Sequence, residues 1–169
     1  QPLVTIAAGV PSDCVEARTD AQVVRIMPNR AAETRDMAAA ATGDLTDEVR
    51  QILGDMGEFA EVDEAQMDIA TAVNGSGPAF VFYLIKAMTE AGVAGGLDHG
   101  KAELLAAQTF KGAAETVIRD DRTADELIDA VCSPNGTTIE GMEVLWDSDA
   151  DESVTAAVEA AERRSAELA

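Results

Sequence analysis

The sequence changes character near residue 63, and this change limits the possible folds more than any other feature. Before it, short apolar runs that end at Gly, Pro or Asn alternate with stretches of helical periodicity. We expect strands over residues 3–8, 22–27, 37–42 and 58–62, a short helix to about residue 18, and a longer helix over 46–56. Strands that alternate with helices in this way predict an α/β sheet.

Beyond Asp63 the sequence predicts helices alone, over residues 64–73, 77–91, 98–120, 123–132, 137–146 and 151–168. Ser76-Gly77-Pro78 indicates a helix start, because Ser is a good cap and Pro suits a first turn. The helix at 77–91 is apolar around nearly its whole circumference. Such a helix is buried on several sides, and in a small domain this indicates a core shared with a second subunit.

The charge balance is strongly acidic, with 12 Lys and Arg against 32 Asp and Glu and a net charge of −20. Only three of the basic residues are lysines, at positions 86, 101 and 111. Nucleic-acid binding is disfavoured, because phosphate backbones need clustered cations. Acid enrichment with few lysines resembles proteins of salt-loving archaea, whose surface charges are screened by concentrated salt. We therefore expect a folded, halophilic protein with an acidic surface.

The cysteines and the apolar runs carry no sign of a metal centre or a membrane anchor. Cys14 and Cys132 lie far apart, without metal-ligand or redox spacing, and are expected to be small buried or half-buried residues. The longest apolar run, 79–85, is too short to span a bilayer, and no signal peptide is visible. A cytoplasmic protein is expected. The chain opens at Gln1 directly into a strand-like run, which suggests a piece of something longer.

Three motifs carry more specific information: 24–29 (Val-Arg-Ile-Met-Pro-Asn), 74–80 (Asn-Gly-Ser-Gly-Pro-Ala-Phe) and 133–139 (Ser-Pro-Asn-Gly-Thr-Thr-Ile). Together with 6–9 (Ile-Ala-Ala-Gly), they resemble in order and spacing the signature segments of pyrroline-5-carboxylate reductases. The resemblance covers essentially the whole chain. The second and third motifs are specific as a pair, whereas either alone is weak.

The resemblance implies a two-domain enzyme that transfers hydride from NAD(P)H to the C=N bond of 1-pyrroline-5-carboxylate and yields L-proline. Residues 1–62 would be the C-terminal portion of a Rossmann-type dinucleotide-binding domain. Residues 63–169 would be a helical domain that binds the substrate and joins two or more subunits. The expected fold is thus an α/β remnant of a Rossmann domain followed by an all-α dimerisation domain.

The resemblance also assigns roles to particular residues. Thr138 would be the catalytic residue, with its hydroxyl near the ring nitrogen of the substrate. Substrate contacts are assigned to Glu64, Gly136, Thr137 and Thr138, and cofactor contacts on the nicotinamide side to Ile6, Ala7 and Ala8. The N–H groups of residues 136–138 would open onto a helix N-terminus, which suits a carboxylate. No metal ligand is implied.

Plainer interpretations exist for several of these residues. Thr137 and Glu140 fit a capping box, and this is compatible with ligand binding. Glu64 could be an ordinary acid in the first turn of a helix. Ser76-Gly77-Pro78 is interpreted as structural, and His99 as a surface residue.

The sequence also departs from the family pattern. A phosphate-binding Gly-x-Gly-x-x-Gly turn is not found, and Gly92–Gly96 does not replace it because it follows a helix. Asn135 stands in place of the first of two glycines, and Ala130 stands where the family often has Asn. We therefore expect the chain to bind NADP or NAD weakly and to be inactive alone. Two alternatives are a non-catalytic dimerisation or regulatory module of the same family and a related imine reductase.

Overall fold

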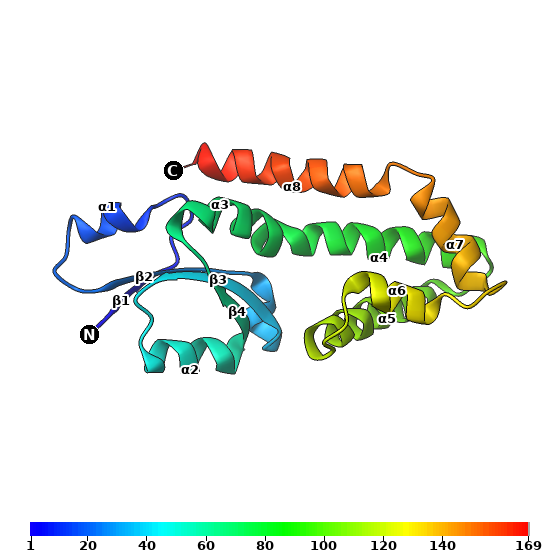
Figure 1. The fold of residues 1–169 in the computed structure, drawn as a ribbon, viewed down its shortest axis with the longest axis horizontal. Coiled ribbons are helices and arrows are strands. Elements are labelled where there is room, and N and C mark those ends of the chain that lie inside the picture. The colour runs from blue at the N-terminus through cyan, green and yellow to red at the C-terminus, as the bar shows by residue number, and fades with distance from the viewer. Residues whose placement is uncertain (169) are drawn as a thin grey trace. The chain divides into compact units, whose positions relative to one another are not determined.

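The structure is a computed structural model that describes residues 1–168. These residues form two compact units, one made of residues 1–79 with 154–168 and the other of residues 80–153. A mixed four-stranded sheet lies in the first unit, and the second is helical. The expected fold class, a small sheet followed by a helical region, is confirmed (Figure 1). The domain boundary after residue 62 stays a prediction.

The sheet holds strands β1 (Leu3–Thr5), β2 (Val23–Pro28), β3 (Met37–Gly43) and β4 (Gly57–Glu61), in the order of the chain. All four expected strands are present. The β1–β2 and β3–β4 pairs are parallel, whereas β2 and β3 run antiparallel. The connection between β2 and β3 is only a 3-10 turn, Arg30–Thr34, that ends at left-handed Arg35. A parallel crossover needs a longer connection, so the chain reverses.

Side chains that alternate along β2 and β3 divide the sheet into two faces. The first face packs against α2 (Asp47–Met56) in a cluster of Val24, Ile26, Met37, Ala39, Ala41, Leu45, Val49 and Leu53. The opposite face packs Met27 and Ala40 against Met67 of α3 (Met67–Ala70). Thr46 caps α2 by accepting from the Val49 N–H at 3.4 Å. The core therefore lies on both sides of β2 and β3.

Strand β1 differs from the buried strand expected over residues 3–8. It is three residues long and lies at the edge of the four-stranded sheet, next to β2. Leu3, Val4 and Ile6 are 39%, 47% and 65% exposed. The expectation of burial was wrong for this chain, because an apolar run becomes buried only where other elements cover it. The short α1 (Ser12–Glu16) follows.

The chain passes from the sheet to the long helix without a new start at Ser76. A 3-10 turn (Glu64–Gln66) leads into α3, then into π-helical turns at Thr71–Ser76, and on into α4 (Gly77–Ala94). Ser76 is thus inside a helical segment, and the expectation that it caps a helix was wrong. Pro78 lacks an N–H and its ring crowds the carbonyl four residues earlier. Widened π turns accommodate such a defect.

The remaining helices agree closely with expectation: α5 (His99–Arg119), α6 (Ala124–Val131), α7 (Thr137–Trp146) and α8 (Ala150–Ala166). Within one chain α4 is not buried on several sides, since Phe82 and Tyr83 are 68% and 73% exposed. Both cysteines are free, but Cys14 is exposed and the expectation for it was wrong, whereas Cys132 is half-buried. No helix within residues 1–168 combines the length and apolarity needed to cross a membrane.

The π-helical turns place the Asn74 side chain against the sheet. Its amide nitrogen donates to the carbonyl oxygens of Met27 at 2.7 Å and Ala38 at 3.0 Å. One side chain thereby joins the ends of β2 and β3 to the segment that becomes α4.

Replacing Asn74 by Ala is expected to lower the free energy of unfolding by about 2 kcal/mol, because two hydrogen bonds to the sheet are lost. Asn74→Asp is expected to be worse, since a carboxylate would face two carbonyl oxygens. Urea unfolding measures both. Gln22→Ala, which removes an exposed amide bonded to Asp44, is the matched control and should change stability by no more than about 0.5 kcal/mol. Equal effects of Asn74→Ala and Gln22→Ala would contradict this role for Asn74.

Candidate functional site

The residues singled out from the sequence fall into two groups. Ile6, Ala7, Ala8 and Glu64 belong to the unit that contains the sheet, and Gly136, Thr137 and Thr138 belong to the helical unit. Each group has a definite local geometry of its own.

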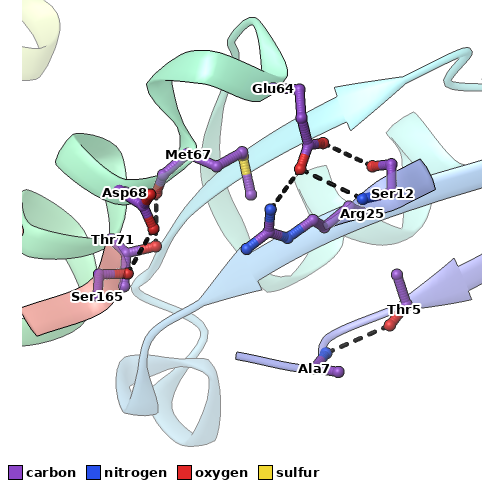
Figure 2. Close-up of polar contacts among 9 residues, drawn as sticks. All are labelled: Thr5, Ala7, Ser12, Arg25, Glu64, Met67, Asp68, Thr71 and Ser165. Atoms are coloured by element: carbon purple, nitrogen blue, oxygen red, sulfur yellow. Dashed lines mark hydrogen bonds and ion pairs between the residues drawn. The ribbon is translucent and has the colours of Figure 1, made fainter. Parts of the chain in front are cut away.

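Glu64 is held by two other elements of the sheet unit (Figure 2). One carboxylate oxygen, Oε1, accepts from the Ser12 N–H at 3.3 Å and from Arg25 Nη1 in an ion pair. The other, Oε2, accepts from the Ser12 hydroxyl at 2.6 Å. Ser12 begins α1 and Arg25 lies in the middle of β2. Glu64 is therefore not merely an acid in a first helical turn, although its expected contact with a substrate stays a prediction.

The environment of Glu64 favours its ionised form. Partial burial acts to raise the pKa of this carboxyl, but the Ser12 hydroxyl, the Arg25 guanidinium and the Ser12 N–H together outweigh it and hold the pKa below its usual 4.5. The Glu64 side chain is still 39% exposed. A group that is ionised and partly open to solvent can accept a further hydrogen bond from a cation or a protonated nitrogen.

Arg25 and Ser12 were not singled out as site residues from the sequence. A signal existed for Arg25, because a charged residue inside the apolar run of residues 23–27 needs a partner when buried. The Arg25 side chain is 5% exposed. Its Nε is buried without a hydrogen-bond partner among residues 1–168. Nothing in the sequence indicated that Ser12 would join the same carboxylate.

The segment Ile6–Ala8 lies directly after β1, at the carboxyl end of that strand, and all three residues are exposed. Thr5, the last residue of β1, is paired with Arg25 and accepts from the Ala7 N–H at 3.3 Å. Figure 2 shows Thr5 and, in the segment that follows β1, Ala7. Ligands of open α/β sheets bind at the carboxyl ends of the strands, and the apolar, exposed side chains of Ile6, Ala7 and Ala8 lie at such an end. They offer no cradle for phosphates, so the cofactor role of Ile6, Ala7 and Ala8 stays a prediction.

The loop before α7 is tightly turned. Asn135 adopts a left-handed conformation with φ of 58°, which confirms the expected imitation of glycine. The Gly136 N–H donates to the Ser133 carbonyl at 2.9 Å. A Cβ on residue 136 would come within 2.9 Å of that same oxygen, so this position requires glycine.

Gly136, and not Thr137, is the N-cap residue of α7, and among residues 1–168 no side chain caps the start of this helix. The expected capping box of Thr137 and Glu140 was therefore wrong, because the helix starts at Thr137, one residue earlier than a motif with Thr137 as its cap requires. The expectation that the Gly136 N–H opens onto a ligand was also wrong, since the turn already uses it. The N–H groups of Thr137 and Thr138 have no partner among residues 1–168, and both side chains are exposed. These two N–H groups at a helix N-terminus can bind a carboxylate.

Two further expectations concern His99 and metals. His99 is exposed at the start of α5, as expected. Within residues 1–168 no group of three His, Cys, Asp or Glu side chains could hold a metal ion.

Substitutions in the loop before α7 have a clear expected order. Asn135→Gly should leave the free energy of unfolding unchanged within about 0.5 kcal/mol, because glycine adopts positive φ freely. Asn135→Ala should cost about 1 kcal/mol, since a Cβ is strained there and lacks the local hydrogen bonding of Asn. Gly136→Ala should cost more than either because of the Ser133 carbonyl. Thermal unfolding ranks the three variants, and a neutral Asn135→Ala would contradict the left-handed conformation.

Comparisons with known proteins agree with this structure. The family described as Pyrroline-5-carboxylate reductase dimerisation matches residues 64–168. The pyrroline-5-carboxylate reductase of Pseudomonas aeruginosa is 39% identical and matches 100% of this chain and 65% of its own length. That of Methanosarcina acetivorans is 38% identical, with 98% and 64% covered. Among the first relatives, pyrroline-5-carboxylate reductase 1 of Bacillus subtilis is 34% identical, and the chain spans 59% of its length.

Solved structures show the same likeness. A pyrroline-5-carboxylate reductase of Coxiella burnetii superposes with a TM-score of 0.92 at 29% identity, over 99% of this chain and 66% of that one. The Plasmodium falciparum pyrroline carboxylate reductase, described with NADP bound, gives a TM-score of 0.85 at 30% identity, over 99% and 71%. By sequence and by fold, this chain belongs to the pyrroline-5-carboxylate reductase family.

Proposed function

We propose that this chain is the substrate-binding and dimerisation part of an enzyme that reduces 1-pyrroline-5-carboxylate to L-proline with NAD(P)H. The observation that carries the proposal is the pair of open N–H groups at Thr137 and Thr138, in a chain whose relatives are named for this reductase. The family resemblance assigns substrate contacts to Glu64, Gly136, Thr137 and Thr138. Gly136 contributes the shape of the loop, because its own N–H is used in the turn.

The reaction needs little from side chains. Bound NAD(P)H would supply the hydride. The carbon of the protonated imine would accept that hydride, and the ring nitrogen, which already carries the proton, would become the amine of proline. We assign to Thr137 and Thr138 the task of holding the substrate carboxylate, and to the Thr138 hydroxyl a hydrogen bond with the ring nitrogen. Holding the acceptor in place is the contribution that this chain would make to the rate.

Binding of proline to the full 169-residue chain tests this proposal. Proline should shift the amide NMR signals of Thr137 and Thr138, and Thr138→Ala should weaken its affinity about tenfold, as for one hydrogen bond to a charged group. Thr109→Ala is the matched control, because the Thr109 hydroxyl bonds only within α5, to the Leu105 carbonyl. A six-membered homologue, pipecolic acid, separates this reductase from a related imine reductase. The same preparation is assayed for NAD(P)H oxidation with pyrroline-5-carboxylate.

Proline binding that is equal in wild type and Thr138→Ala, or absent from the wild type, would overturn the substrate role. That result, together with a stable dimer, would favour the non-catalytic dimerisation module. Tighter binding of pipecolic acid would favour the related imine reductase.

The same family match supports a homodimer or higher homo-oligomer formed through the helical unit. Large apolar side chains are exposed there in the single chain, including Phe82 at 68%, Tyr83 at 73% and Leu104 at 68%. A second copy that covered them would provide the core that α4 lacks by itself. The net charge of −20 opposes association of two copies, and we propose that the protein is halophilic because salt screens this repulsion.

Phe82→Glu is therefore expected to weaken the dimer at least about 100-fold, because a charge would be buried without a partner. Ile52→Glu is the matched control, since Ile52 is 59% exposed on α2, outside the matched residues 64–168. Sedimentation in high and low salt measures the change, and the wild-type dimer should dissociate as salt is removed. A stable wild-type monomer at micromolar concentration in high salt would contradict the assembly.

A further inference from the structure

Burial of the charged Arg25 side chain costs folding free energy, which indicates that this residue has a role other than stability. Its guanidinium is almost fully buried in β2, has one ion-pair partner among residues 1–168, and has its Nε without a partner. The free-energy cost of burying a charge is often not offset by a single ion pair. Apolar residues of similar size at such a position often give equal or greater stability. The neighbours of Arg25 in β2, Val24 and Ile26, are the apolar residues that such a strand prefers.

The partner of Arg25 also lies at a junction. Glu64 receives both the hydroxyl and the N–H of Ser12, the first residue of α1. Arg25 is paired in the sheet with Thr5, the last residue of β1. The segment 6–11, which joins β1 to α1, is therefore anchored at both ends to residues that meet at one carboxylate.

We propose that Arg25 and Ser12 are positioning residues that fix the Glu64 carboxylate in one place and, through it, order the segment 6–11. This proposal rests on the proposed function, because the roles of the ordered residues are the ones assigned there. Residues 6–8 carry the predicted nicotinamide contacts, and Glu64 is the predicted substrate acid. A single carboxylate would thus set the cofactor segment and a substrate contact relative to one another.

Arg25 and Ser12 contact the Glu64 carboxylate from different elements and have different roles. Arg25 reaches Oε1 from β2, which is held by strands on both sides, and so provides the rigid reference. Ser12 reaches both oxygens from α1, a helix of only five residues. Such a short helix is not stable by itself. Its position relative to the sheet depends on contacts such as these.

The test uses the full chain, labelled for NMR, in four forms: wild type, Ser12→Ala, Arg25→Lys and Arg50→Gln. Arg50→Gln is the matched control, because Arg50 forms an exposed ion pair with Glu61 in the same unit. Two quantities are measured. The first is amide hydrogen exchange at residues 6–10 and 12, because Pro11 has no N–H, compared with buried strand residues such as Val24 and Ala41. The second is the titration of the Glu64 carboxyl carbon.

In Ser12→Ala we expect exchange at residues 6–10 and 12 to rise about tenfold relative to the strand amides, since a hydrogen bond to a charged group is lost. The midpoint of the Glu64 titration should move up toward 4.5. Arg25→Lys keeps the charge and should preserve the titration better than the segment's order, because an ammonium cannot reproduce the guanidinium geometry. Arg50→Gln should change neither quantity.

A change in all amides together, with the Glu64 midpoint unmoved in Ser12→Ala, would overturn the proposal and leave these contacts as general stabilisation. If Arg25→Lys does not fold, Ser12→Ala decides the matter by itself. Proline binding to the wild type is measured separately. Its absence would contradict the proposed function, whereas the exchange and titration data would still decide whether Arg25 and Ser12 position Glu64.

Discussion

The ion pair between the buried Arg25 and the partly exposed Glu64 is the interaction on which the arrangement of the sheet unit depends. A guanidinium in the middle of β2 cannot be left without an anion, so the turn that contains Glu64 must lie over that face of the sheet. The same turn leads into α3, whose Met67 packs on Met27 and Ala40 beside Arg25. The ion pair and these apolar contacts thus jointly position the start of the helical segment on the sheet. Asn74 then holds the following π-helical turns against the ends of β2 and β3.

Local patterns were sufficient to predict most of the elements. The helices over 98–120, 123–132 and 137–146 were found within a residue or two, because the periodicity that predicts a helix lies within the segment itself. The strands were found for the same reason. The π-helical turns before Pro78 were missed, since Ser-Gly-Pro is also a common helix start, and only the preceding helical turns decide between the two.

Local sequence patterns could not predict features that depend on residues far apart in the sequence. The contacts of Glu64 with Ser12 and Arg25 span 52 and 39 positions, and nothing local to Glu64 indicates either partner. Burial of β1 was expected from its apolar residues alone, but burial is decided by what covers a strand. The Gly136 N–H looked open in the sequence, whereas a turn closing on Ser133 uses it. In each case the residue type was interpreted correctly and its partner was not.

The acidic composition and the apolar helices have opposite effects on the association of two copies of this chain. Each copy carries a charge of −20, so two copies repel over distances that salt shortens to about 8 Å or less at physiological ionic strength and above. The apolar contacts that would join them act only at contact and are strengthened by many salts. In a single chain the exposed apolar side chains include Phe82 and Tyr83 on α4 and Leu104 on α5. Concentrated salt would therefore stabilise a dimer formed through this unit in two ways, by weakening the charge repulsion and by strengthening the apolar association. An interface built on ion pairs would lose stability under the same conditions. Apolar helices for assembly and few lysines on the surface would both suit the strong salt proposed above as the working condition of this protein.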